Sequence, residues 1–218
     1  MAVGKRQRQQ AARMGVLLRV ERDLWRAGVT NVAGVDEVGV GPLAGPVVAA
    51  AVIVPEDMRL RGVDDSKKLT PARREAIAAE ITVRAIGIGV GVVDVADIDR
   101  LNIYHAALEA MRRAVLALPL IPGHLVVDAR RIPDLEVPQT SLIHGDARSF
   151  SVAAASIVAK VRRDGMMRDL DALYPHYGFR DNMGYGTPAH LAAIDQHGPS
   201  PVHRRSFAPV RELRLPGF

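Results

Sequence analysis

Short apolar runs, bounded by glycine, proline or polar residues, recur along the chain and predict buried strands. Runs of about four to eight apolar residues are typical of such strands, because they are too short to form a helix. One of them, Val47–Val54, is apolar at every position, which predicts a strand that is covered on both faces. The strands that we predict are Val32–Val35, Val47–Val54, Arg84–Val93, His124–Val127 and Ser141–Ile143.

Stretches in which apolar residues follow a helical period separate these strands or come after them. Their ends carry residues that stabilise helix termini, such as Thr70 at one start and Gly198 at one end. We predict a loop for Tyr174–Gly186 and an extended tail for Ser200–Phe218. The predicted helices are Ala11–Ala27, Thr70–Ile81, Asp94–Arg100, Asn102–Leu118, Ser149–Leu173 and Thr187–His197.

The order of these elements predicts an α/β fold, with a mixed sheet and helices packed on it. The first three strands can pair antiparallel, whereas the later strands, which are reached through helices, can run parallel to the first. Glycine at alternate positions, Gly87, Gly89 and Gly91, leaves one face of the third strand nearly bare. That pattern predicts either a close approach by another element or a weak edge of the sheet.

Composition narrows the kinds of protein that this chain can be. Its 218 residues and 48% hydrophobic content suffice for one large domain with a real core, and they exclude a disordered chain. The absence of cysteine excludes disulfides, zinc fingers and thiol catalysis. The N-terminus does not resemble a signal peptide and no apolar run reaches about 18 residues, so we expect a soluble cytoplasmic protein. The formal net charge of +5 is compatible with a polyanionic partner, but many ordinary proteins carry as much.

Acidic residues recur where the predicted strands end. Asp36 and Glu37 follow the first strand, and Asp128 and Asp146 follow two later ones. If the first and fourth strands run parallel and adjacent, Asp36 and Asp128 reach the same edge of the sheet, where open sheets place their sites. Carboxylates suit Mg²⁺ and Mn²⁺, and two such ions about 4 Å apart support in-line attack on a phosphodiester. The alternative is that each acid caps a turn or solvates a strand end.

A glycine-rich turn follows the first pair of acids. It contains Gly39, Gly41 and Gly45 together with two prolines, and glycine leaves the backbone accessible to a phosphate or a sugar. The alternative is an ordinary hairpin turn. No Lys-Ser or Lys-Thr pair follows these glycines, so the turn is not a P-loop.

A series of sequence blocks, which together span about Ala33 to Phe207, resembles the ribonuclease HII family. Several blocks in the family's order are far more specific than any one of them. They are Gly34–Val47, Asp65–Leu69, Leu125–Asp128, Gly145–Asp146, Ala153–Lys160 with Arg163–Asp164, Tyr174–Phe179 and Gly184–Pro188.

The resemblance implies a ribonuclease H-like fold, in which a mixed five-stranded sheet is flanked by helices and followed by a helical C-terminal extension. Residues 1–30 would form a basic arm and a helix, and residues 31–218 the catalytic domain, whose C-terminal helical region starts at about residue 174. The implied activity is metal-dependent cleavage of the RNA strand in RNA–DNA hybrids and at single ribonucleotides in duplex DNA. Cleavage would leave 3′-hydroxyl and 5′-phosphate ends, with Mg²⁺ or Mn²⁺ as the cofactor and a monomer as the active form.

The resemblance also assigns roles to individual residues. The four acids that bind metal and catalyse cleavage in the family correspond to Asp36, Glu37, Asp128 and Asp146. A glycine turn that lies against the ribose and a tyrosine that stacks under the sugar at the RNA-to-DNA junction complete the family's site, and they correspond to Gly39, Val40, Gly41 and Tyr185. Lys67, which lies in a matching block, and Lys160 are candidate phosphate ligands. The alternative is that these lysines only solvate the surface.

Three positions depart from the family's pattern. Val40 stands where the family usually has arginine, His144 where it has lysine, and Ala129 where it has glycine. The first departure removes a charged contact to the substrate and leaves open an alternative, a hybrid-binding protein with weakened cleavage. A metal-binding structural protein without affinity for nucleic acid is a third reading. The tail Leu213–Phe218 is a candidate for weak contact with a sliding clamp.

Overall fold

The computed structural model describes residues 11–60, 62–63 and 69–212. The predictions for the basic arm, for Lys67 and for the tail Leu213–Phe218 lie outside the described residues. Residues 11–17 are helical, as predicted, and α2 continues this N-terminal helix after a break at Leu18. The helices that follow are α2 (Arg19–Arg26), α3 (Pro71–Arg84), α4 (Val95–Leu101), α5 (Ile103–Leu116), α6 (Phe150–Leu173), α7 (Phe179–Asn182) and α8 (Pro188–His197).

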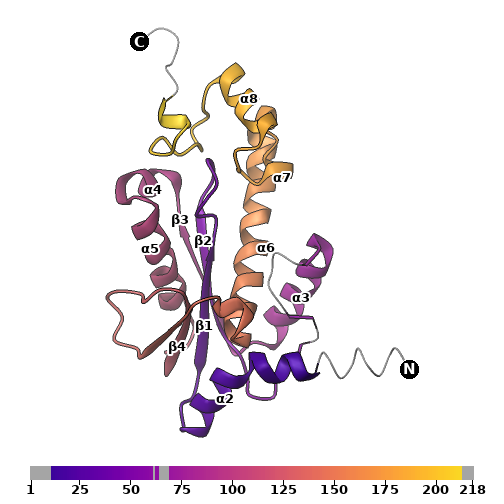
Figure 1. Ribbon diagram of the computed structural model, residues 1–218, viewed down its shortest axis with the longest axis vertical. Coiled ribbons are helices and arrows are strands. Elements are labelled where there is room, and N and C mark those ends of the chain that lie inside the picture. The colour runs from indigo at the N-terminus through magenta and orange to yellow at the C-terminus, as the bar shows by residue number, and fades with distance from the viewer. Residues whose placement is uncertain (1–10, 61, 64–68, 213–218) are drawn as a thin grey trace, which may run out of the picture.

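The sheet has five strands in the order β3-β2-β1-β4-β5. The first three strands pair antiparallel, and β4 and β5 extend the sheet in parallel with β1, which confirms the predicted mixed topology. Figure 1 shows α4 and α5 on one side of this sheet and α6 with α3 on the other. The strands are β1 (Val32–Val38), β2 (Val47–Ile53), β3 (Gly87–Val93), β4 (His124–Asp128) and β5 (Gln139–Leu142).

The helix starts follow the predicted chemistry. Thr70, Ser149 and Thr187 each precede a helix, and each side chain accepts a hydrogen bond from the backbone N–H three residues later. Asn102 caps α5 in the same way, through the N–H groups of Tyr104 and His105. These side chains satisfy N–H groups that have no partner within the helix, so they fix where each helix begins.

The glycines of β3 permit a close approach by α5. A β-carbon at Gly89 or Gly91 would collide with the backbone carbonyls of Ala114 and Ala110 in that helix. Because β3 is also an edge strand, both features that its glycine pattern predicts are present. The short side chains let α5 cover the sheet over the core that it shares with β1, β2 and β4.

The C-terminal region is more ordered than predicted. The segment predicted as a loop contains the short helices η3 (Pro175–Tyr177) and α7, and residues 200–212 of the segment predicted as an extended tail fold back on the body of the protein. His203 pairs with Ala44 in a β-bridge, and both His203 and Arg204 are buried. The prediction failed because their partners are remote in the sequence. In the part of the chain that the structure describes, no helix has the length and apolar character needed to cross a membrane.

Candidate active site

Asp36 and Glu37 lie inside β1, not after its end as the sequence pattern predicted. The strand continues to Val38 because β2 pairs with it along this stretch, placing Asp36 opposite Ala50 and Glu37 opposite Ala49. Successive residues of a strand point to opposite faces of the sheet. Asp36 therefore faces α6, whereas Glu37 leaves the backbone toward the side that α5 covers.

Asp128 lies on the same face of the sheet as Asp36. Val35 is paired with Val127 in parallel register, so the two aspartates are the next residues along neighbouring strands. One carboxylate oxygen of Asp128 accepts a hydrogen bond of 2.6 Å from the backbone N–H of Gly145. The parallel register thus brings together two of the four predicted acids, as the sequence analysis expected.

Asp146 follows Gly145 in η2 (Gly145–Ala147), between β5 and α6. The hydrogen bond from Gly145 to Asp128 ties this short helix to the end of β4, so the residue before Asp146 is fixed against another predicted acid. The sequence pattern predicted Asp146 shortly after a fifth strand, and in the structure that strand ends at Leu142. We use the name carboxylate edge for Asp36, Glu37, Asp128 and Asp146.

The Asp36 carboxyl is buried, with 6% of the residue exposed. Burial raises its pKa well above the ordinary value, and the negative charges of Glu37 and Asp128 raise the pKa further. A hydrogen bond with the side chain of Ser156 in α6 acts in the opposite direction. Gly34, on the same face of β1, lets α6 come this close, because a β-carbon there would collide with the backbone at Ser151. The sequence analysis gave Ser156 no role.

These surroundings fit a divalent cation. A buried carboxylate crowded by like charges is stabilised when a cation neutralises it. Within the described residues, no three His, Cys, Asp or Glu side chains are grouped so that they alone could hold an ion. Mg²⁺ does not require such a cage, since proteins commonly hold it through one or two carboxylates together with water and substrate phosphates. The pair Asp36 and Asp128 meets that requirement.

The glycine turn begins directly after β1. Gly39 needs to be glycine, because its φ is +92° and a β-carbon would collide with the Arg163 side chain. Gly41 is different: its φ lies outside the left-handed region, and a β-carbon there would meet only the Tyr185 ring, at 3.5 Å. Neither backbone conformation nor crowding explains glycine at that exposed position. The structure therefore brings together Gly41 and Tyr185, which lie 144 residues apart in the sequence.

Tyr185 is 47% exposed, while its backbone is held by hydrogen bonds. Its carbonyl accepts hydrogen bonds from the N–H of Thr187, at 2.8 Å, and from Nδ1 of His190, at 2.8 Å. Its own N–H donates to the carbonyl of Asn182 at 2.9 Å. A large aromatic side chain that stays nearly half exposed on a fixed backbone is available to a ligand.

A chain of buried polar groups continues behind the Tyr185 carbonyl. Since a carbonyl only accepts, Nδ1 of His190 is the donor, and Nε2 of neutral His190 then accepts from Nε2 of His203 at 2.9 Å. Nδ1 of His203 in turn accepts from the backbone N–H and the hydroxyl of Ser200. Burial lowers the pKa of both histidines, to about 4 for His203. A proton on either ring would set two N–H donors against each other.

Two buried arginines that the sequence analysis overlooked surround the glycine turn. Arg204 donates to the carbonyls of Gly39, Val40 and Gly45. Arg163 of α6 donates to the carbonyls of Pro46 and Ala44 and to that of Met183, close to Tyr185. We use the name arginine-held turn for residues 39–46 with these two arginines.

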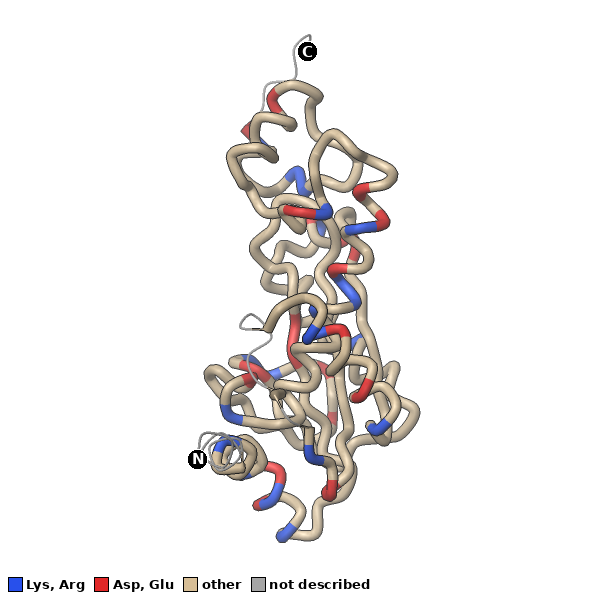
Figure 2. Tube along the Cα trace, turned by 90° about the vertical axis from the view of Figure 1, so that its right-hand side faces the viewer, with Lys and Arg blue, Asp and Glu red and all other residues tan. Residues whose placement is uncertain are grey.

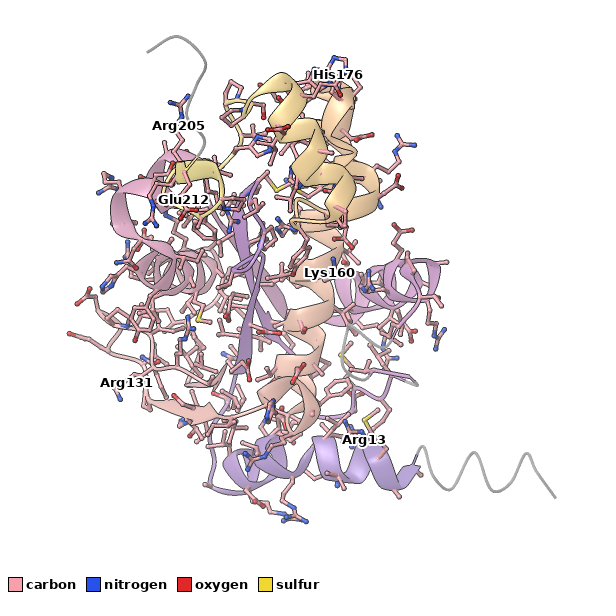
Figure 3. All side chains as sticks on the ribbon, turned by 45° about the horizontal axis from the view of Figure 1, so that its top comes forward. Arg13, Arg131, Lys160, His176, Arg205 and Glu212 are labelled. Carbon is pink, nitrogen blue, oxygen red and sulfur yellow. The ribbon has the colours of Figure 1, made fainter. Side chains whose placement is uncertain are left out.

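The N-terminal helix reaches the catalytic region through Glu21. This fully buried carboxylate accepts hydrogen bonds from the hydroxyls of Ser149 and Ser151 and from the N–H of Ser151, at the start of α6. A negative charge at a helix N-terminus is stabilised by the helix dipole. Arg13, labelled in Figure 3, also donates to the carbonyl of Ala147, next to Asp146. The boundary predicted at residue 30 stays a prediction, and the helix before it packs on the same core.

The departures at Ala129 and His144 lie next to the predicted acids. Both residues have positive φ, of 54° and 56°, the left-handed region that favours glycine. The usual glycine of the family at position 129 thus has a conformational reason, and alanine is strained there. Lys160, which Figure 3 labels, donates to Asp164 four residues later in the same helix.

The net positive charge is not gathered on one surface in the view of Figure 2, where basic and acidic residues intersperse along the trace. Several of them form ion pairs on one helix, such as Arg112 and Arg113 with Glu109 on α5. Recognition of a polyanion would therefore depend on local groups near the carboxylate edge more than on the overall field.

Comparison with known proteins identifies one family. The family model for ribonuclease HII matches residues 33–210. A ribonuclease HII of Geobacillus thermodenitrificans is 58% identical over 212 residues, which are 96% of this chain and 82% of that protein. The crystal structure of ribonuclease H2 from Pyrococcus horikoshii matches with a TM-score of 0.72 and 30% identity, covering 83% of this chain and 95% of that one.

A third match is the Archaeoglobus fulgidus ribonuclease HII in its complex with PCNA, with a TM-score of 0.69 and 28% identity, over 84% of this chain and 96% of that one. The five-stranded mixed sheet and the helical C-terminal region are thus those of a ribonuclease H-like fold. On its sequence and its fold, the chain belongs to the ribonuclease HII family and is a ribonuclease H, a hydrolase that acts as a nuclease.

Proposed function

We propose that this ribonuclease H is a divalent-metal-dependent endoribonuclease that cuts RNA–DNA hybrids and single ribonucleotides embedded in duplex DNA. The products would carry 3′-hydroxyl and 5′-phosphate ends. The observation that carries the proposal is the position of the arginine-held turn. It starts at Gly39, directly after the strand that bears Asp36 and Glu37. Its exposed Gly41 faces the ring of the half-exposed Tyr185.

The carboxylate edge would hold Mg²⁺ or Mn²⁺ through Asp36, Glu37, Asp128 and Asp146. Bound divalent ions supply charge neutralisation and activation of water for in-line attack on a phosphodiester. Asp36 keeps its carboxylate oriented through the hydrogen bond with Ser156, and Asp128 through the N–H of Gly145. Both acids are therefore set in place before substrate arrives, which lowers the cost of assembling the site.

The substrate would be read on both sides of the cut. Backbone groups of Gly39, Val40 and Gly41 would contact the ribose and its 2′-hydroxyl, because glycine lets the sugar come close. The Tyr185 ring would stack on the deoxyribose of the next nucleotide, and Lys67 would bind a phosphate. With valine at position 40, the turn offers no side-chain charge to the substrate.

The tail Leu213–Phe218 would make a weak contact with a sliding clamp. The Archaeoglobus fulgidus relative was solved as a complex with PCNA, which supports the same kind of partner for this chain. We propose that the catalytic unit itself acts as a monomer.

The test is cleavage mapping on duplex DNA that contains one ribonucleotide, with Mg²⁺ or Mn²⁺ added to metal-free protein. We expect one cut at the ribonucleotide, dependent on the added ion, and none on the same duplex with deoxyribose. Asp128→Asn should bind this duplex without cutting it. Binding by the wild-type chain without cleavage at any ion concentration would instead support a hybrid-binding protein, and the absence of binding would support a structural role.

The role of Tyr185 has its own test. Ring stacking on nucleic acid contributes about 1–3 kcal/mol by alanine substitution. Tyr185→Ala should therefore slow cleavage at a single ribonucleotide roughly tenfold or more, while a long hybrid, which offers many contacts, should lose less. Tyr185→Phe keeps the ring and serves as the matched control. Equal losses on both substrates, together with a lower melting temperature, would show that the tyrosine serves the fold.

A further inference from the structure

Arg204 is fully buried, and its guanidinium donates hydrogen bonds to three backbone carbonyls and lies over one aromatic ring. Nη1 donates to the carbonyl of Val40 at 3.0 Å, and Nη2 donates to that of Gly39 at 2.6 Å. Nε and Nη2 both donate to the carbonyl of Gly45, at 3.0 and 2.8 Å, and the guanidinium carbon lies 5.0 Å over the Phe207 ring. The arginine is thus hydrogen-bonded to both ends of the turn, which lie 159 to 165 residues away in the sequence.

These hydrogen bonds also fix the direction of two N–H groups. In a planar trans peptide, the C=O of one residue and the N–H of the next point in opposite directions. When the Gly39 and Val40 carbonyls point at the buried Arg204, the N–H groups of Val40 and Gly41 point away from it. Gly41 is exposed, so its N–H is directed toward the side from which a substrate can approach.

Two further contacts hold this geometry. The backbone N–H of Arg204 donates to the carbonyl of Leu43, and the N–H of Leu43 donates to Gly184, which precedes Tyr185. The second arginine, Arg163, joins the same turn to Met183. The turn, the tyrosine loop and the segment after α8 therefore form one connected unit.

We propose that Arg204 is a positioning residue for ribose recognition, which sets the amide groups of Val40 and Gly41 as hydrogen-bond donors toward the ribonucleotide. The inference rests on the proposed function and adds to it a residue from the C-terminal segment. Valine at position 40 suits this arrangement, because recognition then depends on the backbone of that residue and not on its side chain. Arg204 itself does not touch the substrate.

The experiment measures how strongly the protein prefers a duplex with one ribonucleotide over the same duplex with deoxyribose. Binding is measured in the Asp128→Asn background, so that no cleavage interferes. Arg204→Lys keeps a positive charge, but a single ammonium group cannot reach the three carbonyls with the same geometry. We expect Arg204→Lys to reduce the preference about tenfold, the change that corresponds to one lost hydrogen bond.

Two control variants separate positioning from general destabilisation. Arg205→Lys alters the exposed neighbour, which Figure 3 labels at the periphery. Arg74→Lys alters another buried arginine, which pairs with Asp164 on the α3 side of α6. Both should keep the wild-type preference, even if Arg74→Lys lowers the melting temperature. An unchanged preference in Arg204→Lys, or an equal loss in Arg74→Lys, would overturn the proposal.

A second measurement needs no variant at position 204. In the Asp128→Asn chain, the amide resonances of Val40 and Gly41 should shift when the ribonucleotide duplex binds and stay in place with the deoxyribose duplex. If both duplexes shift them equally, the amides do not read the ribose and the inference fails. If the unaltered turn shows no preference for a ribonucleotide at all, the failure is that of the proposed function.

Discussion

The carboxylate edge and the arginine-held turn are adjacent regions that bury charge in opposite ways. At the carboxylate edge, burial and neighbouring negative charges raise the pKa of Asp36. At the turn, burial lowers the pKa of Arg163 to about 10 and that of Arg204 to about 9, and the charge of Arg163 also lowers the pKa of Arg204. Each region thus disfavours its own charged form.

The difference lies in what completes the hydrogen bonding. The two guanidinium groups are surrounded by carbonyl oxygens of the protein, so the chain itself supplies what their charge requires. At the carboxylate edge, Asp36 lies close to the negative charges of Glu37 and Asp128, and a cation from outside would relieve their repulsion. Buried charge therefore marks a ligand site only where the protein leaves the charge uncompensated, and elsewhere it serves to hold backbone in place.

The largest expected effect removes one charge from the carboxylate edge. Asp36→Asn should lower cleavage by on the order of 10²–10³ or more, as expected for the loss of a key electrostatic group. Without metal, the same variant should melt at a higher temperature than wild type, because the amide removes a buried repulsive charge and can still hydrogen-bond with Ser156. Calorimetry with and without Mg²⁺ measures the second effect.

Ser156→Ala is the companion variant, since it removes the hydrogen bond and leaves the charge. It should lower the stability of the metal-free protein, whereas Asp36→Asn should raise it. Near-normal turnover by Asp36→Asn at saturating Mg²⁺ would remove this acid from the site.

The second prediction uses pH to distinguish the carboxylate edge from the two buried histidines behind Tyr185. The pKa of His203 is about 4 in the folded chain, against an ordinary value of 6.5, so the folded state holds this ring neutral. The unfolded chain binds the proton first as the pH falls. The contribution of His203 to the free energy of unfolding is therefore complete above about pH 6.5. It declines by roughly 3 kcal/mol as the pH falls toward 4. Asp36, with its raised pKa, acts in the opposite sense, since it favours the folded state at low pH and loses that contribution as the pH rises.

Melting curves between pH 4 and 7.5 measure this dependence. His203→Gln should make the decline on the acid side less steep, because the histidine with the larger shift in pKa is gone and only His190 of the pair remains. His176→Gln is the matched control, since His176 is an exposed histidine, labelled in Figure 3, that lies near the same end of the molecule. If His203→Gln keeps the wild-type slope, another group is responsible for it.

The smallest predicted effect tests whether the arginine-held turn can gain a charge of its own toward the substrate. Val40 is partly buried against the core under α5, so a longer side chain there must extend outward. Val40→Arg should tighten hybrid binding by about 1.5–3 kcal/mol, the contribution of a charged hydrogen bond, and steepen its dependence on salt. Val40→Met has a similar length without the charge and should leave the affinity unchanged. A weaker or unchanged affinity of Val40→Arg at low salt would contradict the assigned role of the turn.

Much of the fold follows from local patterns in the sequence. The strand β2 is a continuous apolar run, and the caps at Thr70 and Ser149 act on N–H groups only three residues away, so a short window contains all the necessary information. The carboxylate edge was also predictable in part. Asp36 and Asp128 come together because parallel pairing aligns two apolar runs of similar length.

The parts that were missed depend on distant partners. Nothing near Arg204 in the sequence indicates that it binds carbonyls 159 or more residues away, and an arginine is expected to be exposed by default. The extension of β1 through Asp36 and Glu37 depends on pairing with β2, which overrides the low strand preference of acidic residues. The ordered segment after α8 is likewise stabilised by contacts with the turn and not by its own pattern.

The buried carboxylate of Glu21 has a consequence for the order in which the chain folds. Its partners at Ser149 and Ser151 lie 128 and 130 residues downstream, so during synthesis the N-terminal helix emerges long before the residues that secure it. The entropic cost of closing a loop rises only slowly with its length, by about 0.6 kcal/mol for each doubling. The long separation between Glu21 and its partners along the chain therefore lowers the stability of the finished protein only slightly. Glu21 can make these hydrogen bonds only after the start of α6 has been synthesised, so this part of the anchoring of the N-terminal helix is a late event.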